Sequence, residues 1–220
     1  TGILIDNPFI NKNNTIYNPL LYLSVNGSKN NTDEISNELT TDNEFDISRF
    51  FSVNRYTSNE KFDNGQRIGY GLDIKSKDFD FNIAQGFQID DNSDYNSDVN
   101  MKNDFSDVLG GFIIKDVYDT GLKFDYNYRY NPSIKNIYYQ ESSIKGESKV
   151  GSFNISYYNA DPRSSTLSFD TRETLNFSFN SEKFLDYSTV SLSTNYDLLH
   201  DRTQDYTLGY NYNDNCFGAN

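Results

Sequence analysis

Hydrophobic and polar residues alternate with a period of two along most of the chain. Between Gln66 and Lys75, one side carries Ile68, Tyr70, Leu72 and Ile74, while the other carries Arg67, Gly69, Gly71 and Asp73. The same alternation covers residues 79–89, 122–130 and 206–213. Strict alternation predicts β-strands with one apolar face and one polar face. No segment has a convincing helical period.

We expect about ten strands from this pattern. Their expected ranges are 16–25, 66–76, 79–89, 106–116, 120–130, 136–145, 149–159, 167–180, 184–196 and 204–214. Many of them have the length that a tilted strand needs to cross a bilayer, and they exceed the usual length in soluble sheets. Long links, above all the long loop over 26–65, alternate with tight turns, as in outer-membrane barrels. We therefore predict an all-β fold, an antiparallel transmembrane β-barrel segment with long loops on one side and short turns on the other.

A soluble β-sandwich or a fibre shaft would show the same alternation. Strand length, loop asymmetry and long polar side chains such as Lys123 and Arg129 favour a barrel with a wet lumen instead. Strand edges cannot lie in lipid with unpaired backbone groups, and the sequence ends at Asn220 just after a strand. We therefore interpret residues 1–220 as a single partial domain, an open arc of about ten strands of a larger barrel.

Composition supports a sheet and narrows the possible partners. The chain has 18 Tyr and 17 Phe although its hydrophobic fraction is only 35% and its mean hydropathy is −0.75. Apolar surface is thus concentrated in side chains that suit a pleated sheet, and disordered chains are poor in such residues. The formal net charge of −13 argues against nucleic acid, whose phosphates require clustered Lys and Arg. No apolar run is long enough for a transmembrane helix.

No group of residues indicates catalysis or a metal site. His200 lies near Asp197 and Asp201 without a nucleophile that could be placed beside it, so a solvated loop histidine is the simpler interpretation. The acidic stretch 90–94 lacks the glycine and the terminal Glu of a calcium loop. A single His and a single Cys are too few soft ligands for zinc. We expect no enzyme activity, no cofactor and no metal.

The stretch 36–71 reads SNELTTDNEFDISRFFSVNRYTSNEKFDNGQRIGYG. It resembles the signature of the lipopolysaccharide-assembly outer-membrane protein family, LptD, in which P-N-E-D-S precedes F-D-D-x-N-L-F, N-R-F-S-G-x-D-R-x-E-G-G-x-R and a Y-G strand. The matching or conservatively replaced positions are Asn37, Glu38, Phe45, Asp46, Phe50, Phe51, Asn54, Arg55, Tyr56, Glu60, Lys61, Asp63, Gly65, Arg67, Tyr70 and Gly71. The sequence departs from the signature at Ser36, Leu39, Arg49, Ser58 and Asn64.

The resemblance implies a structural loop network that caps the barrel and holds its loops in place. Its members would be Asn37, Glu38, Phe45, Asp46, Asn54, Arg55, Glu60, Lys61, Asp63, Gly65 and Arg67. In this network Arg55 and Arg67 would be bidentate partners for the carboxylates. The charges by themselves equally indicate a solvated surface loop, so both interpretations stay open at this point.

The resemblance also implies a function and partners for the whole protein. Lipopolysaccharide would be received from a periplasmic transport bridge, through an N-terminal domain absent from this chain, and inserted into the outer leaflet of the outer membrane of a Gram-negative bacterium. A plug lipoprotein would lie in the barrel lumen. Cys216 looks like the family's cysteine that forms an interdomain disulfide, whereas the residue alone indicates only a free thiol.

Two other classes of protein share parts of this pattern. A general porin or transporter barrel would show the alternation, but it would not carry the signature between Phe45 and Gly71. A non-membrane β-rich surface or adhesion protein would remain soluble without detergent. In each case the strands would be the same, and the signature or the behaviour in detergent would separate the classes.

The loop network predicts an energetic coupling between Arg55 and Asp63. In the full-length protein, replacing each by Ala and then both should reveal a coupling of about 0.5–3 kcal/mol in the free energy of unfolding, because the two charged groups would be direct partners. The measurement is a double-mutant cycle. Strictly additive effects would rule the pairing out.

Overall fold

A computed structural model describes most of the chain. The described residues are 2–11, 13–27, 47–52, 65–89, 105–117, 120–133, 135–161, 171–182, 187–213 and 218–219. The strands are β1 (Gly2–Asp6), β2 (Phe9–Ile10), β3 (Ile16–Asn26), β4 (Gly65–Lys75), β5 (Phe79–Gln88), β6 (Val108–Ile114), β7 (Leu122–Asn131), β8 (Asn136–Ser148), β9 (Gly151–Ala160), β10 (Arg172–Ser181), β11 (Ser188–Asp197), β12 (Arg202–Asn213) and β13 (Gly218–Ala219). The helix α1 is Ile47–Phe50.

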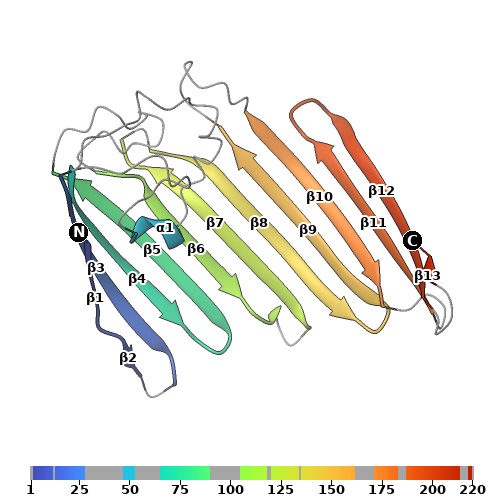
Figure 1. The fold of residues 1–220 in the computed structure, drawn as a ribbon, viewed down its shortest axis with the longest axis horizontal. Helices are drawn as coiled ribbons and strands as arrows, with labels where there is room; N and C mark the ends of the chain where they lie inside the picture. The colour runs from blue at the N-terminus through green and yellow to red at the C-terminus, as the bar shows by residue number, and fades with distance from the viewer. Residues whose placement is uncertain are drawn as a thin grey trace. The chain divides into compact units, whose positions relative to one another are not determined.

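The strands form an antiparallel sheet in which hydrogen-bonded neighbours follow one another in chain order, as Figure 1 shows. Only β2 leaves this path, and it pairs with β3 beside β1. Because consecutive strands run in opposite directions, successive connections leave from opposite ends. The link from β4 to β5 is the short turn 76–78, whereas β3 and β4 are separated by residues 27–64. The expected alternation of long and short connections is confirmed at these strands.

The all-β prediction is confirmed, and each expected strand has a counterpart in β3 to β12. The helix α1 has four residues, which is about one turn and too short to display a period of 3.6 in the sequence. β1 and β2 were missed because Asn7 and Pro8 interrupt a short segment, and proline removes a backbone donor from the ladder. β13, with two residues, was missed for its length.

The chain divides into two compact units. Unit 1 comprises residues 1–112, 128–138 and 163–167, and unit 2 comprises 113–127, 139–162 and 168–220. The interpretation of residues 1–220 as a single partial domain stays a prediction.

In unit 1 the register of β3, β4 and β5 assigns each residue to one of two faces. One row of opposite residues is Tyr22, Gly69 and Gly86, and the next row along the strands is Leu23, Ile68 and Phe87. Successive side chains of a strand point to opposite faces. The sheet of unit 1 therefore has a polar face of small and polar residues and an apolar face of large aliphatic and aromatic residues, as the alternation predicted.

Burial in unit 1 is the reverse of that in a soluble protein. On the polar face Tyr22 is only 2% exposed, whereas its neighbours Leu21 and Leu23 on the apolar face are 39% and 38% exposed. The core cluster consists of Phe50, Ala84 and Leu109, with Ile47 and Phe51 packed against it, so α1 contributes Ile47 and Phe50. Because a soluble sheet buries its apolar face, this arrangement fits strands whose apolar face lies in membrane lipid.

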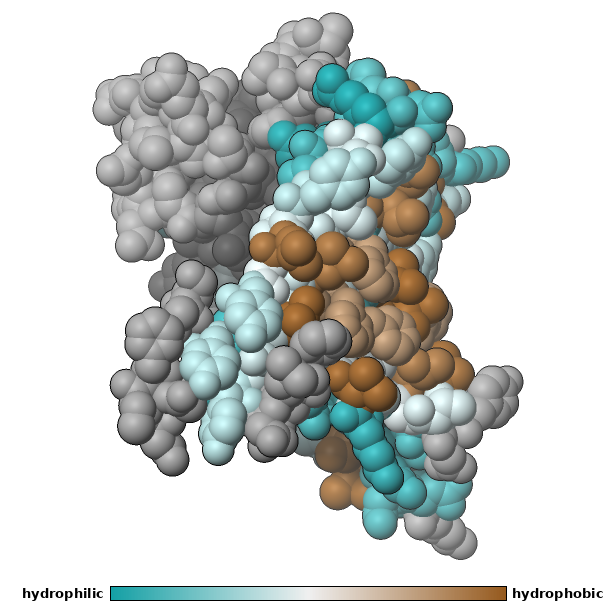
Figure 2. Space-filling model, turned by 90° about the vertical axis from the view of Figure 1, so that its right-hand side faces the viewer, coloured by the Kyte–Doolittle hydropathy of each residue, from teal (hydrophilic) through white to brown (hydrophobic). Residues whose placement is uncertain are grey.

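Unit 2 has the same two faces. The apolar rows across β8 to β12 include Ile144, Ile155, Phe177, Thr194 and Tyr206, followed by Gly146, Phe153, Phe179, Leu192 and Leu208. Large side chains in these rows are exposed, with Tyr206 and Leu208 at 77% and 76%. Figure 2 shows apolar side chains gathered across the middle of one side, with hydrophilic side chains above and below. A band with that arrangement is typical of a lipid-facing surface.

Among the described residues, no helix has both the length and the apolar character to cross a membrane.

Glycine at position 86 is required by its contact with α1. A Cβ added to Gly86 would lie 2.9 Å from Cζ of Phe50, whereas nothing lies within 4 Å of the same position at Gly27. We expect Gly86→Ala to lower the free energy of unfolding of the full-length protein in detergent by about 1–3 kcal/mol, the usual cost of overpacking. Gly27→Ala is the matched control and should change it little. Equal stability of the two variants would contradict this packing.

Candidate functional site

The polar face of the sheet is the candidate functional site, and in unit 1 part of it is covered by α1. The ring of Phe50 lies over Gly69 and Gly86, and the ring of Phe51 lies over Gly71. We call Gly69, Gly71 and Gly86 the glycine patch. A side chain at any of these three positions would occupy the space of the two rings. The two phenylalanine rings meet edge to face, with centroids 5.0 Å apart, a favourable geometry for an aromatic pair.

Arg67 fixes the segment that follows α1. Its Nη2 donates a hydrogen bond to the carbonyl oxygen of Ser52, and its guanidinium lies 5.2 Å from the centroid of the Tyr22 ring. Arg67 is only 6% exposed, so these contacts compensate for the lost hydration of the cation. Its membership of the predicted loop network stays a prediction, because the carboxylates expected as its partners lie outside the described residues.

Gly65 is the other predicted network residue within the described part of the chain. It begins β4 with a φ of 90°, a backbone conformation that strongly favours glycine. The remaining predicted residues lie outside the described residues: Asn37, Glu38, Phe45, Asp46, Asn54, Arg55, Glu60, Lys61, Asp63 and Cys216. Their network and the disulfide of Cys216 stay predictions.

A buried polar cluster of Asp107, Arg129 and Tyr138 also lies in unit 1. Arg129 Nη2 lies 3.7 Å from Oδ2 of Asp107, and the hydroxyl of Tyr138 donates a hydrogen bond to the same oxygen. The guanidinium of Arg129 lies 5.2 Å from the centroid of the Tyr138 ring. All three residues are less than a tenth exposed. The cluster joins the segment before β6, β7 and the beginning of β8.

In unit 2 the polar face presents rows of short hydroxyl and amide side chains. One row contains Ser143, Ser156, Asn176, Asn195 and Asp205, and the next contains Lys145, Asn154, Ser178, Ser193 and Thr207. Most of these side chains are half-buried. Hydroxyl and amide groups both donate and accept hydrogen bonds. This face can therefore bind water or the hydroxyl groups of a passing molecule without a large charge.

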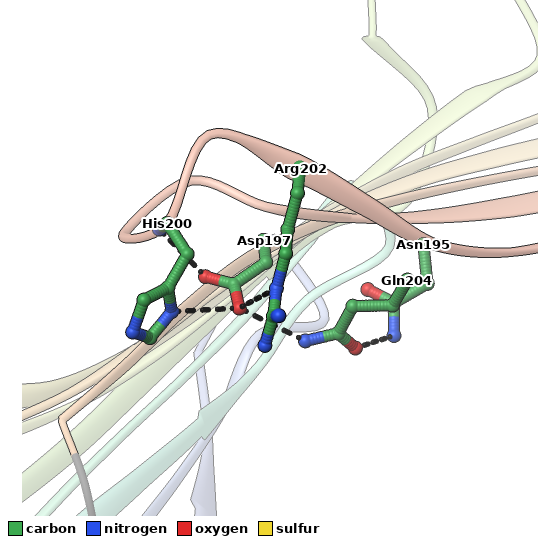
Figure 3. A network of polar contacts seen from close by, with 5 residues as sticks. All are labelled: Asn195, Asp197, His200, Arg202 and Gln204. Atoms are coloured by element: carbon green, nitrogen blue, oxygen red, sulfur yellow. Dashed lines mark hydrogen bonds and ion pairs between the residues drawn. The ribbon is translucent and has the colours of Figure 1, made fainter.

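A polar network closes the hairpin between β11 and β12 (Figure 3). The side chains of His200, Arg202 and Gln204 point toward the carboxylate of Asp197. Their nitrogens lie 2.9, 3.7 and 3.3 Å from its Oδ2, and the backbone N–H of His200 donates to Oδ1 at 3.1 Å. The Nδ2 of Asn195 extends the network by donating to Oε1 of Gln204 at 2.8 Å.

Asp197 is the last residue of β11, directly before the turn that leads to β12. Burial of its carboxyl group raises the pKa, but the hydrogen bonds from His200 and Gln204 lower it more, so the pKa of Asp197 is below its ordinary value. The carboxylate is thus ionised at neutral pH and holds the turn. His200 lies in the turn with its side chain 55% exposed, so the expected solvated loop histidine is confirmed, and Asp197 is its structural partner.

Among the described residues, no group of His, Cys, Asp and Glu side chains could hold a metal ion.

Sequence reasoning missed the glycine patch as a site and the Asp107 cluster. The signal for the patch was present, because Gly69 and Gly71 both stand on the polar side of the alternation. The cluster had no comparable signal, because Asp107 and Arg129 are far apart in the sequence and only the pairing of strands brings them together.

Comparison with known proteins supplies a family. A family model described as LptD, LPS transport system D, matches residues 5–202. That match covers most of the chain, including every strand from β3 to β11. No curated protein matches the sequence.

Burial should decide how much each of two arginine–aspartate pairs contributes to stability. The Arg129–Asp107 and Arg202–Asp197 pairs are both 3.7 Å apart, but the side chains are 5% and 2% exposed in the first and 68% and 9% in the second. We expect Arg129→Met to lower the free energy of unfolding by about 3–5 kcal/mol, because it removes a cation next to a buried carboxylate.

Arg202→Met is the matched control, and its effect should be much smaller because water screens an exposed guanidinium. The measurement is urea unfolding of the full-length protein in detergent. An equal loss in both variants would show that burial does not separate the two pairs.

Proposed function

This chain belongs to the LptD family, with a role in lipopolysaccharide transport, and we propose that it is part of the outer-membrane translocon that inserts lipopolysaccharide into the outer leaflet. The observation that carries the proposal is the pairing of an exposed apolar face with a polar face of hydroxyl and amide rows in unit 2. Membership of this family does not imply an enzyme, since the family model describes a transport system.

The two faces suit the two parts of the substrate. Lipopolysaccharide combines sugars and phosphates with acyl chains, which require opposite surroundings. The polar rows of unit 2 offer hydrogen-bonding groups to the sugars. The exposed apolar rows, with residues such as Leu192 and Leu208, are compatible with membrane lipid. We infer that the sugar part passes along the polar face while the strands stand in the outer membrane of a Gram-negative bacterium.

Partners of the whole protein follow from the same proposal. We expect a plug lipoprotein in the lumen and a periplasmic lipopolysaccharide-transport bridge, which would reach the barrel through the N-terminal domain. Cys216 would form the disulfide to that domain. The loop network that begins at Asn37 and includes Arg67 would hold the loops over the polar face. In unit 1, the contacts of Arg67 with Ser52 and Tyr22 support such a holding role.

We would not expect a general porin to match the LptD family model over residues 5–202. A non-membrane adhesion protein would have to expose side chains such as Tyr206 and Leu208 to water, at a cost of about 25 cal/mol for each Å² of apolar surface. Both alternatives are therefore less consistent with the findings than the translocon.

Substitutions on the two faces of β11 test the proposal. Ser193 lies in a polar row and the adjacent Leu192 in an apolar row. We expect Ser193→Trp in the full-length protein to slow the appearance of new lipopolysaccharide at the cell surface severalfold, because the ring obstructs the polar face. Leu192→Trp should leave the rate unchanged, because an indole is tolerated next to lipid.

The rate is measured by labelling surface lipopolysaccharide in cells that depend on the variant, after confirming equal amounts of protein in the outer membrane. If Ser193→Trp transports normally, the passage does not follow this face. If cells lacking the unmodified protein still deliver lipopolysaccharide to the surface, the translocon role itself is wrong.

A further inference from the structure

The aromatic residues of unit 2 follow one rule with two exceptions. In the paired residues of β8 to β12 within unit 2, the aromatic side chains in apolar rows are Phe153, Tyr157, Phe177, Phe179, Tyr196, Tyr206, Tyr210 and Tyr212. Tyr139 and Tyr158 instead belong to polar rows. Both positions can be recognised in the sequence, because each residue is the second member of a Tyr-Tyr doublet that breaks the alternation. Local departures from a pattern are expected at functional sites.

The two exceptions are neighbours. Tyr139 on β8 lies opposite Ala160, and Tyr158 on β9 lies opposite Glu141, so the two tyrosines are diagonal to each other. Their ring centroids are 5.5 Å apart with an interplanar angle of 89°. The small side chain of Ala160 leaves room beside the Tyr139 ring. Both residues are half-buried, so neither side chain is fully covered.

Polar groups surround the aromatic pair. The hydroxyl of Tyr139 donates to Oε2 of Glu141 at 3.3 Å. Thr174 lies opposite Tyr158, and Arg172 lies opposite Ala160. The next row along the strands contains Ser143, Ser156 and Asn176. An aromatic surface bordered by hydroxyl, amide and carboxylate groups is thus present at one end of the polar rows.

We propose that Tyr139 and Tyr158 form a stacking platform for a sugar ring of lipopolysaccharide. This inference rests on the proposed function and assigns a place on the polar face to the saccharide. A sugar ring has a face of C–H bonds that packs on an aromatic ring, and its hydroxyl groups require hydrogen-bonding partners at the rim. Glu141 and Thr174 provide acceptors and a donor next to the rings.

An acyl chain is a poorer occupant of the same place. It would have to leave the glutamate, threonine and arginine side chains around the pair without hydrogen-bonding partners, which costs free energy. A saccharide satisfies those groups and still covers the rings. The rows of Ser, Thr and Asn that continue from the platform offer further hydrogen bonds to a chain of sugars.

The direct test uses the full-length protein in detergent and the water-soluble saccharide released from lipopolysaccharide by removal of its acyl chains. The variants Tyr139→Leu and Tyr158→Leu should each bind this saccharide about threefold to tenfold more weakly, the loss expected for one aromatic contact. Tyr139→Phe and Tyr158→Phe keep the ring and should bind like the unmodified protein. Tyr206→Leu, in an apolar row, is the control for loss of an exposed tyrosine elsewhere.

Thermal unfolding of each variant shows whether it remains folded, and the Phe variants separate loss of the ring from loss of the hydroxyl group. Binding that is equal in the Leu and Phe variants, or as weak in Tyr206→Leu, overturns the platform. So does a lack of saccharide binding by the unmodified protein. Surface delivery of lipopolysaccharide in cells is measured in parallel, so that normal delivery by a Leu variant refutes the platform while leaving the transport role intact.

Discussion

The hydrogen-bond ladder between consecutive antiparallel strands is the interaction on which the other features depend. It satisfies the backbone of each strand through its neighbours, which is a requirement for any sheet in lipid. It also sets the register, and a shift of one residue would exchange the two faces. Because Leu23 stands opposite Ile68 and Tyr22 opposite Gly69, the apolar residues form continuous rows. The exposed apolar surface and the polar face both result from this register.

The polar face carries different side chains in the two units. In unit 1, the glycine patch removes side chains so that Phe50 and Phe51 of the α1 segment can lie directly on the sheet. Apolar packing thus occurs on the face that the alternation labels polar, and buried Arg67 adds a hydrogen bond to it. In unit 2, short side chains such as Ser156 and Ser193 remain half-buried in their rows. The first arrangement stabilises a loop segment, whereas the second provides surface for a hydrophilic ligand.

Most of the strands could be predicted because period-two alternation is a local property of each segment. The candidate site was only partly predictable. Arg67 was singled out through the family resemblance, but its contacts with Ser52 and Tyr22 required the folded chain. Asp107 and Arg129 form their buried pair only because neighbouring strands bring them together. The sequence around a polar residue in a strand does not indicate such a partner, and most polar residues of strands face water.

The sequence by itself determined the all-β class, which residues share a face of each strand, and through the 36–71 stretch the family, because each of these is written in local order along the chain. The tertiary structure alone decided where unit 1 has a packed core. Leu21 and Leu23 are exposed on the apolar face, as the sequence pattern of a membrane strand predicts. The core forms instead around Phe50 and Ala84, because α1 packs where glycines let a ring approach the backbone.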